Sequence, residues 1–203
     1  MPAPILLLHG ILDAPSTWDA VARRLREAGR EVIAPAAPDE ALTPQQVAHA
    51  ARPLLPAHLV GHSRGGTAAS WLAVDAPEMT RSLAVVASPP QASEVFRAHF
   101  ARRVDRARTP HERGTLAYLA TIPEEDFPQH ALRRYRGRAL VVEYEDDPLY
   151  GPTQTLFWRM FLPYADFERV PGGHRAFAES DEAAAWLAAR VLRHVEGAEG
   201  LQG

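Results

Sequence analysis

The sequence contains no cysteine, and it also contains no lysine, because all 22 of its basic residues are arginine. The absence of cysteine excludes disulfide bonds, thiolate nucleophiles and cysteine-liganded metal sites. The absence of lysine excludes a Schiff base, a lysine general base and the lysine of a phosphate-binding P-loop. A biased genomic base composition is a sufficient explanation for the arginine usage.

The chain also has little excess charge of either sign. Its formal net charge is -3 and its isoelectric point is near 6.3, so it has no electrostatic footprint for nucleic acid or an acidic membrane. The apolar run near the start, in MPAPILLLHGIL, is only four residues long and no basic residue precedes it. We therefore expect no nucleic-acid partner, no signal peptide and no membrane span, with a cytoplasmic location as the default prediction.

Length and composition predict a single folded unit. With 203 residues, of which 46% are hydrophobic and 23% charged, the chain fits one domain with one sizeable core. No internal repeat, low-complexity tract or linker divides it. We expect residues 1–203 to form a single domain, present as a monomer or a homodimer.

Short apolar runs alternate with amphipathic stretches along the chain. The runs typical of buried strands lie at residues 5–8, 31–34, 58–61, 82–87, 138–144 and 167–170. The stretches typical of helices lie at residues 16–28, 43–54, 67–76, 153–162 and 181–195. This alternation predicts an α/β fold, a mostly parallel sheet of about six strands with helices on both faces.

Capping signals mark the first two helices. Ser16 precedes the first amphipathic stretch as a candidate N-cap, and Gly29 is placed to end it. The segment Thr43-Pro44-Gln45-Gln46 has the form of a capping box with proline at the first helical position.

One serine lies between glycines in LVGHSRGG, residues 59–66, directly after an apolar run. A strand followed at once by G-x-S-x-G is typical of a turn that lifts a serine above the edge of a sheet. A glycine-rich loop that happens to contain a serine is the alternative. Ser63 is therefore a candidate nucleophile only if suitable partners occur elsewhere in the chain.

Polar side chains follow several predicted strands at their carboxyl ends, which meet at one edge of a parallel sheet. His9 follows the first run, Ser63 the third, Asp146 and Asp147 the fifth, and His174 the sixth. A serine hydroxyl needs a base to take its proton and a carboxylate to orient that base. His174 and Asp147 supply both, and the chain order Ser, Asp, His is the one expected for this turn.

The motifs LLLHG, GHSRGG, LVVEYEDDP and GGH occur in this order between about residues 5 and 195. Together they resemble the oxyanion loop, nucleophile elbow, acid loop and histidine loop of the α/β-hydrolase family. The resemblance implies that Ser63 is the nucleophile, that His174 is the general base, and that the backbone N–H groups of Ile11 and Arg64 form the oxyanion hole. It also implies an acyl small molecule as the partner and no cofactor.

The chain departs from the family at its start and in its acid loop. It begins almost directly at the strand that ends in His-Gly, so we expect a shortened fold in which residues 31–34 form a sheet edge. Related chains usually carry G-x-x-D after the fifth strand, which makes Asp147 the triad acid here, although Tyr144 occupies the glycine position. Asp146 is the alternative acid. A carboxylate before Pro148 that only caps a turn is the structural alternative.

The histidines do not have the spacing of a known metal motif. His9, His62 and His174 lack the carboxylate and histidine partners of a zinc site, so we expect no metal. The resemblance implies that His9 and His62 are structural. The Arg64 guanidinium either meets an acidic substrate group or decorates the start of a helix.

Residues 91–137 resemble the small helical lid that this family inserts over its active site. Helices are expected at residues 93–104 and 113–121. An apolar acyl pocket is the predicted role of the nearby large side chains. The candidate pocket residues are Leu12, Pro89, Phe96, Phe100, Tyr118, Leu149 and Tyr150.

The predicted lid is richer in positive charge than the rest of the chain. It holds nine arginines against six acids, a net charge of +3 in a chain that is -3 overall. One hypothesis is that the lid favours anionic substrates, such as an ester that bears a carboxylate or an acyl thioester. Solvated helix faces account for the same count.

The leading prediction is a serine hydrolase, carboxylesterase-like, that cleaves a small ester or thioester through an acyl-enzyme. Carbon–carbon bond hydrolysis, amide cleavage and acyl transfer use the same triad and stay open. A ligand receptor or an interaction scaffold on the same fold is the alternative outside enzymes. Sequence pattern alone leaves the substrate and the acyl length undetermined.

Overall fold

A single parallel sheet forms the centre of the molecule. The computed structural model describes residues 2–38, 42–149 and 152–200. Within them, six strands pair in the order β2-β1-β3-β4-β5-β6, and every pairing is parallel. The strands are β1 (Ile5–Leu8), β2 (Val32–Ile33), β3 (Ala57–His62), β4 (Thr80–Val86), β5 (Ala139–Tyr144) and β6 (Asp166–Val170). The predicted fold class is confirmed, and the short β2 lies at an edge as expected.

The strand register brings the candidate site residues to one edge of the sheet. Leu8 at the end of β1 pairs with Gly61, and His62 at the end of β3 pairs with Val86. The residues after β1, β3, β4 and β5 therefore emerge side by side at the carboxyl edge. β1 is covered on both faces, and its sequence ILLL is a continuous apolar run rather than an alternating one.

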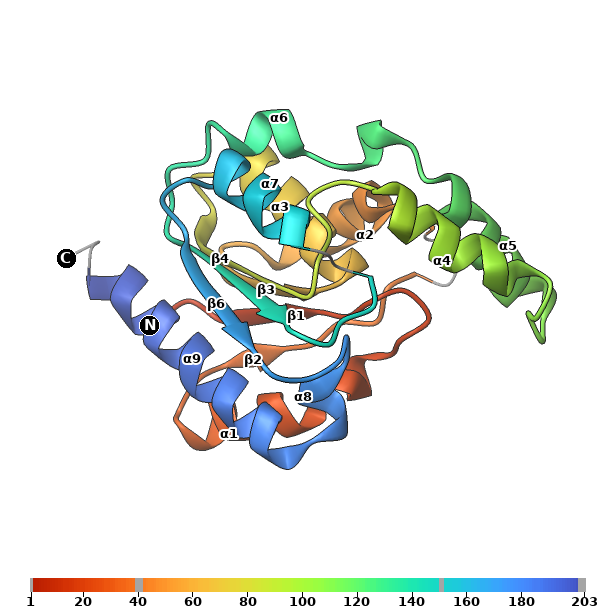
Figure 1. Ribbon diagram of the computed structural model, residues 1–203. Coiled ribbons are helices and arrows are strands. Elements are labelled where there is room, and N and C mark those ends of the chain that lie inside the picture. Colours follow the sequence, from red (N-terminus) through yellow and green to blue (C-terminus); the bar gives the residue numbers. More distant parts are fainter. Residues whose placement is uncertain (1, 39–41, 150–151, 201–203) are drawn as a thin grey trace.

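Helices cover both faces of the sheet (Figure 1). One face packs against α1 (Asp19–Glu27), α8 (Ala176–Glu179) and α9 (Asp181–Gly200), and the opposite face packs against α2 (Pro44–Ala51), α3 (Arg64–Asp75) and α7 (Pro152–Phe161). Each face has its own apolar cluster. Among the described residues, no helix combines the length and apolarity that a bilayer crossing requires.

The segment between β4 and β5 is largely helical, and its first two helices lie apart from the sheet while its last helix packs against the core through Leu132. It contains α4 (Glu94–Val104), α5 (Pro110–Thr121), a 3₁₀ turn (Glu124–Asp126) and α6 (Gln129–Leu132). Figure 1 shows α4 and α5 as a helical hairpin that extends away from the sheet. Phe96, Phe100, Leu116 and Leu119 join these two helices in a third apolar cluster, distinct from the clusters on the sheet. Residues 91–137, the range predicted for a lid, therefore fold largely as helices.

The helix boundaries correct two expectations from the sequence. Ser16 does not cap a helix, because it lies inside a 3₁₀ turn (Pro15–Trp18) and α1 starts only at Asp19 without a side-chain cap. The second helix, expected to reach residue 54, ends at Ala51 and is followed by a separate 3₁₀ turn (Arg52–Leu54). Pro53 explains this end, since proline cannot donate the hydrogen bond that a continuing helix needs. The capping box at Thr43 is confirmed.

Candidate active site

Ser63 occupies a strained turn between β3 and α3. Its φ is 53° and its ψ is -122°, and its N–H donates to the Val86 carbonyl at 3.0 Å. A β carbon at Gly61 would lie 2.2 Å from the Gly65 oxygen, and one at Gly65 would lie 2.2 Å from the Leu8 oxygen. Both positions therefore require glycine, as expected for this turn. A non-glycine residue at positive φ is strained, and such strain is concentrated at functional sites.

Ser88, which the sequence did not single out, is hydrogen-bonded to the backbone of the serine turn. Its hydroxyl donates to the Ser63 carbonyl at 2.8 Å, and its own carbonyl accepts the Trp158 Nε1–H at 3.0 Å. Ser88 is buried directly after β4, where Ala87 also has a positive φ of 43°. Its position at a strand end was the only available signal, because the contact joins residues 25 positions apart.

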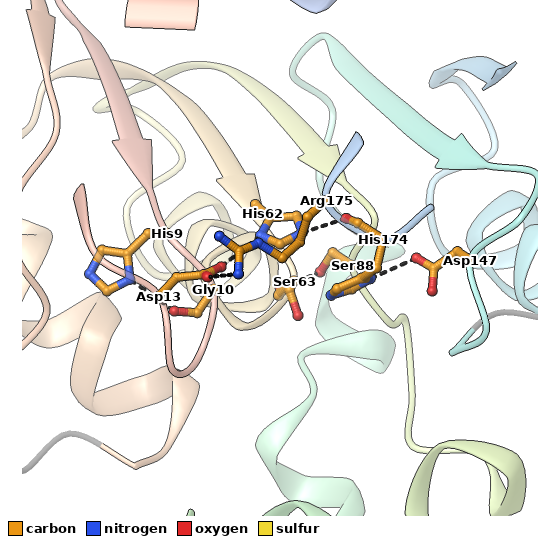
Figure 2. Close-up of polar contacts among 9 residues, drawn as sticks. All are labelled: His9, Gly10, Asp13, His62, Ser63, Ser88, Asp147, His174 and Arg175. Carbon is orange, nitrogen blue, oxygen red and sulfur yellow. Dashed lines mark hydrogen bonds and ion pairs between the residues drawn. The ribbon is translucent and has the colours of Figure 1, made fainter. Parts of the chain in front are cut away.

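His174 and Asp147 form a short hydrogen bond at the carboxyl edge. The distance from His174 Nδ1 to Asp147 Oδ2 is 2.6 Å, and Asp147 Oδ1 accepts the Leu149 N–H at 2.9 Å. Asp147 is 4% exposed, whereas Asp146 is exposed to solvent. The structure therefore brings Asp147, and not Asp146, to the imidazole. Figure 2 shows the Ser63 side chain and the His174 ring directed into the same space.

The backbone of the acid loop is tied to the backbone of the histidine loop. The Glu145 N–H donates to the Val170 carbonyl at 2.9 Å, and the Asp146 N–H donates to the Gly172 carbonyl at 3.0 Å. These bonds extend the pairing of β5 and β6 past the strand ends. Asp146 therefore contributes through its backbone to the loop that carries His174.

A small cavity opens at Ser63 under the helical hairpin. Its volume is about 20 Å³, which leaves room only for a small group without side-chain movement. Ile11 and Arg64 line it together with Ser63. Arg64 is the first residue of α3, and the N–H groups at a helix N-terminus favour negative charge. The other lining residues are Pro44, Thr67, Pro89, Phe96, Phe100, Tyr118, Leu119, Ile122 and Phe127.

Of the seven predicted pocket residues, four line this cavity, two do not, and one lies outside the described residues. Pro89, Phe96, Phe100 and Tyr118 line the cavity as the sequence predicted. Leu12 does not, because it has a positive φ of 61°, is 45% exposed and lines a different cavity beside His9 and Asp13. Leu149 instead packs into the apolar cluster of the hairpin, and its N–H serves Asp147. Tyr150 lies outside the described residues.

The Arg64 guanidinium is not a surface decoration of its helix. The side chain reaches both the Ser63 cavity and the neighbouring cavity of about 310 Å³ lined by Asp13 and His111. Burial lowers the pKa of Arg64, and the nearby Tyr118 and Asp13 partly offset that effect. Tyr118 in turn donates to Asp126, and burial together with that bond raises the pKa of the Tyr118 hydroxyl.

His62, the residue before Ser63, forms a second histidine–carboxylate pair with Asp13. Nδ1 of His62 is 3.4 Å from Oδ2 of Asp13, and Nε2 of His62 donates to the His174 carbonyl at 2.9 Å. Arg175 pairs with the other oxygen of Asp13 at 3.2 Å. Figure 2 shows this chain of contacts, which joins the loop after β1 to the loop that carries His174. The resemblance implied only a structural role for His62, and the sequence gave no signal for Asp13.

The electrostatics of this pair are set by burial and by Arg175. Burial raises the pKa of Asp13, but the hydrogen bond and charge of His62, followed by the charge of Arg175, bring it below its ordinary value. Burial lowers the pKa of His62, the contact with Asp13 offsets part of that effect, and the charge of His174 lowers the pKa further. Asp13 is therefore a buried carboxylate that is ionised and held between two basic side chains.

His9 is fully occupied by backbone groups. Its Nε2 accepts the Ala37 N–H at 3.1 Å, so its Nδ1 carries the proton and donates to the Gly10 carbonyl at 2.8 Å. Burial lowers the pKa of His9, which favours this neutral form. Within residues 2–38, 42–149 and 152–200, no three histidine or carboxylate side chains are arranged to hold a metal ion.

The sheet order, the strained serine turn and the carboxyl-edge histidine and aspartate together define an α/β-hydrolase architecture. The model of the alpha/beta hydrolase family matches residues 5–201, and the chain belongs to this family. No curated protein matches the sequence.

Several solved structures share the fold at low sequence identity. A provisionally assigned non-heme bromoperoxidase, BpoC, from Mycobacterium tuberculosis is 19% identical with a TM-score of 0.80, and the match covers 98% of this chain and 93% of that one. The thioesterase domain from the curacin biosynthetic pathway is 20% identical with a TM-score of 0.71, covering 94% and 91%. A thermophilic esterase from Thermogutta terrifontis is 17% identical with a TM-score of 0.74, covering 96% and 91%. At these identities the likeness shows the fold.

Proposed function

We propose that this chain is a serine hydrolase that cleaves a small-molecule ester or thioester through an acyl-enzyme. Ser63 is the nucleophile, His174 the general base and Asp147 the acid that orients the base. The 2.6 Å bond from His174 Nδ1 to a buried Asp147 carries the proposal, because it leaves Nε2 as the proton acceptor on the side of Ser63. The esterase and thioesterase structures of the same fold support this class of reaction.

The proposed reaction has two halves. In the first, His174 Nε2 takes the Ser63 proton as Oγ attacks the carbonyl carbon, and the imidazolium then protonates the leaving group. In the second, water loses a proton to His174 and attacks the acyl carbon, and the imidazolium then returns the proton to Ser63 Oγ as the bond to the acyl group breaks and the acid is released. The Ile11 and Arg64 backbone N–H groups stabilise the oxyanion in both halves, each contributing about 3 kcal/mol.

Other activities of the same constellation are alternatives to this proposal. An amidase, a carbon–carbon bond hydrolase or an acyltransferase would use the same three side chains, and a receptor or scaffold would use the fold without turnover. The paired and buried Asp147 favours chemistry, since a scaffold has no need of an oriented imidazole. A cytoplasmic location and a monomeric or homodimeric state stay predictions.

A fluorophosphonate probe separates the hydrolase from the receptor and scaffold alternatives. We expect the native protein to form a covalent adduct with the probe on Ser63, because an activated serine attacks phosphorus as it attacks a carbonyl. Mass spectrometry of the digested protein locates the adduct. Heat-denatured protein and the Ser63→Ala variant are the controls, and an unlabelled native protein would contradict the proposed function.

His62 is expected to act as a positioning residue for His174. His62→Leu removes the donor to the His174 carbonyl and should lower kcat for a neutral ester by ~10- to 100-fold with little change in KM, since small misplacements of a catalytic group are that costly. His62→Gln keeps a donor near the Nε2 position and should recover most of the rate. Steady-state kinetics of both variants provide the measurement.

His58 offers the matched control for that experiment. His58 is as buried as His62 and lies on the same strand, but it is near the start of β3, away from Ser63, and its ring is hydrogen-bonded to the Ser82 hydroxyl. His58→Leu should therefore lower the melting temperature, as His62→Leu does, without changing kcat. Equal kcat in His62→Leu and the native protein would show that the contact with the His174 carbonyl has no positioning role.

A further inference from the structure

A cleft rich in arginine lies on the helical hairpin. It has a volume of about 450 Å³ and opens between the end of α4 and the start of α5. Four arginines line it, with a single carboxylate among the remaining lining residues. The lining residues are His99, Arg102, Arg103, Arg106, Arg108, Glu112 and Leu116.

These four arginines differ from their neighbours on the hairpin in their lack of carboxylate partners. Arg97 pairs with Glu124 at 3.1 Å and Arg113 pairs with Asp105 at 3.9 Å. In contrast, none of the four cleft arginines forms an ion pair with a carboxylate in the part of the chain that the structure describes. The Glu112 carboxylate accepts the backbone N–H of Arg108 at 2.8 Å, and its single negative charge offsets only one of the four guanidinium charges. The cleft therefore carries positive charge that the hairpin does not neutralise.

The cleft adjoins the Ser63 cavity through a ring contact on α4. The His99 ring, which lines the cleft, packs edge-on against the Phe100 ring at a centroid distance of 5.1 Å, and Phe100 lines the Ser63 cavity. Arg102 and Arg103 follow about one turn further along α4, where burial and then their charges lower the pKa of His99. Exposed guanidinium groups therefore lie about one turn beyond the part of α4 that covers Ser63.

The two sides of Ser63 consequently have opposite character. The acyl side is the small apolar cavity beneath Phe96 and Phe100. The leaving group has to lie on the His174 side, because the imidazolium protonates the leaving atom. Next to the apolar cavity, beyond the ring of Phe100, the hairpin presents His99 and the arginines of the cleft.

We propose that the cleft binds an anionic group on the leaving-group half of the substrate, so that the preferred substrates are esters or thioesters of an alcohol or thiol with a remote phosphate or carboxylate. The inference rests on the proposed function, since it takes the leaving group to depart past His174. Arginine suits this role because its planar guanidinium forms paired hydrogen bonds with either kind of oxyanion. Binding here should weaken with salt, as expected for exposed charges.

Matched thioesters test the proposal in the native protein. S-butyryl-4′-phosphopantetheine and S-butyrylpantetheine have the same acyl group and scissile bond and differ only in the terminal phosphate. We expect kcat/KM to be at least ~10-fold higher for the phosphorylated compound at low ionic strength, with the preference shrinking as salt is added. The carboxylate arm compares 4-acetoxybenzoate with 4-acetoxybenzamide, so the pair that shows the preference identifies the anion.

Two triple variants of equal charge locate the effect. Replacing Arg102, Arg103 and Arg106 by glutamine should abolish the preference and leave the rate on neutral substrates unchanged. The control replaces Arg133, Arg134 and Arg136 by glutamine, a change of the same charge in exposed side chains outside the cleft, and should retain the preference. Equal loss in both variants would overturn the proposal, as would a preference that survives in the cleft variant.

Binding measurements separate this inference from the proposed function. Calorimetry with the Ser63→Ala variant compares 4′-phosphopantetheine with pantetheine without requiring turnover. If the phosphorylated thiol binds more tightly and the cleft variant loses this difference, the result supports the anion site even if no thioester is hydrolysed. Equal binding of the two thiols, together with equal binding of 4-hydroxybenzoate and 4-hydroxybenzamide, would contradict the anion site. If the native protein still hydrolyses neutral esters, the proposed function is unaffected by that result.

Discussion

Replacing Ser63 by alanine is expected to lower kcat for p-nitrophenyl acetate by on the order of 10⁶-fold, because no other group can form the acyl-enzyme. Some acceleration over the uncatalysed reaction should persist, since the Ile11 and Arg64 N–H groups still stabilise an oxyanion. Stopped-flow measurement should show a burst of p-nitrophenol in the native protein if deacylation is slow, and no burst in the variant.

Ser70 provides the control for this substitution. It is a buried serine on α3, the helix that follows the turn, and its hydroxyl donates to the Gly66 carbonyl at 2.9 Å. Ser70→Ala removes the same oxygen atom from a nearby site, so it should affect stability by about 1 kcal/mol and leave kcat within a few-fold of native. If Ser63→Ala retains native activity, the hydrolysis does not proceed through this serine.

Replacing Asp147 by asparagine is expected to lower kcat by about 10⁴-fold with intact folding. In the native protein, the His174 Nδ1–H donates to Asp147 Oδ2 at 2.6 Å. An asparagine that keeps its bond to the Leu149 N–H through its oxygen would present an amide N–H to Nδ1, which favours the wrong tautomer of the imidazole. Nε2 would then carry the proton and could not accept another from Ser63. Kinetics and circular dichroism of the variant provide the measurement.

Asp146→Asn is the matched control, because it makes the same chemical change one residue earlier. The Asp146 side chain is exposed, and its contribution to the site is the backbone N–H that bonds the Gly172 carbonyl. Asparagine preserves that backbone bond, so the expected change in kcat is less than about tenfold. A severe loss in Asp146→Asn together with a mild one in Asp147→Asn would exchange the roles of the two carboxylates.

The layered fold followed from patterns that are local in the sequence. Runs such as Ile5–Leu8 are apolar at consecutive positions, which predicts strands covered on both faces, and the structure confirms them. The capping box at Thr43 was equally visible, since all of its groups lie within four residues. Ser16 was a candidate N-cap by residue type alone, but it lies in a 3₁₀ turn in which Trp18 is buried among core side chains. Packing of that large ring overrode the local preference.

The pocket shows where residue type alone was insufficient. Leu12 and Phe96 are both apolar and both belong to segments near Ser63, yet Phe96 lines the cavity and Leu12 points elsewhere. The left-handed backbone at Leu12 turns its side chain out of the cavity, and nothing in the sequence predicts that conformation for leucine. The direction of a loop side chain depends on dihedral angles that only the packed loop determines.

The sequence by itself determined the order of strands and helices, the turn that carries Ser63 and the presence of a histidine and an aspartate after the later strands. These features depend on spacing within a motif and on the rule that parallel strands end at one edge. Only the tertiary structure showed that Asp147, rather than Asp146, contacts the His174 imidazole. Only it joined Asp13 through His62 to the His174 carbonyl, and Ser88 to Ser63. The physical reason is that burial and hydrogen bonding between residues far apart in the chain depend on how the loops pack, which no local pattern records.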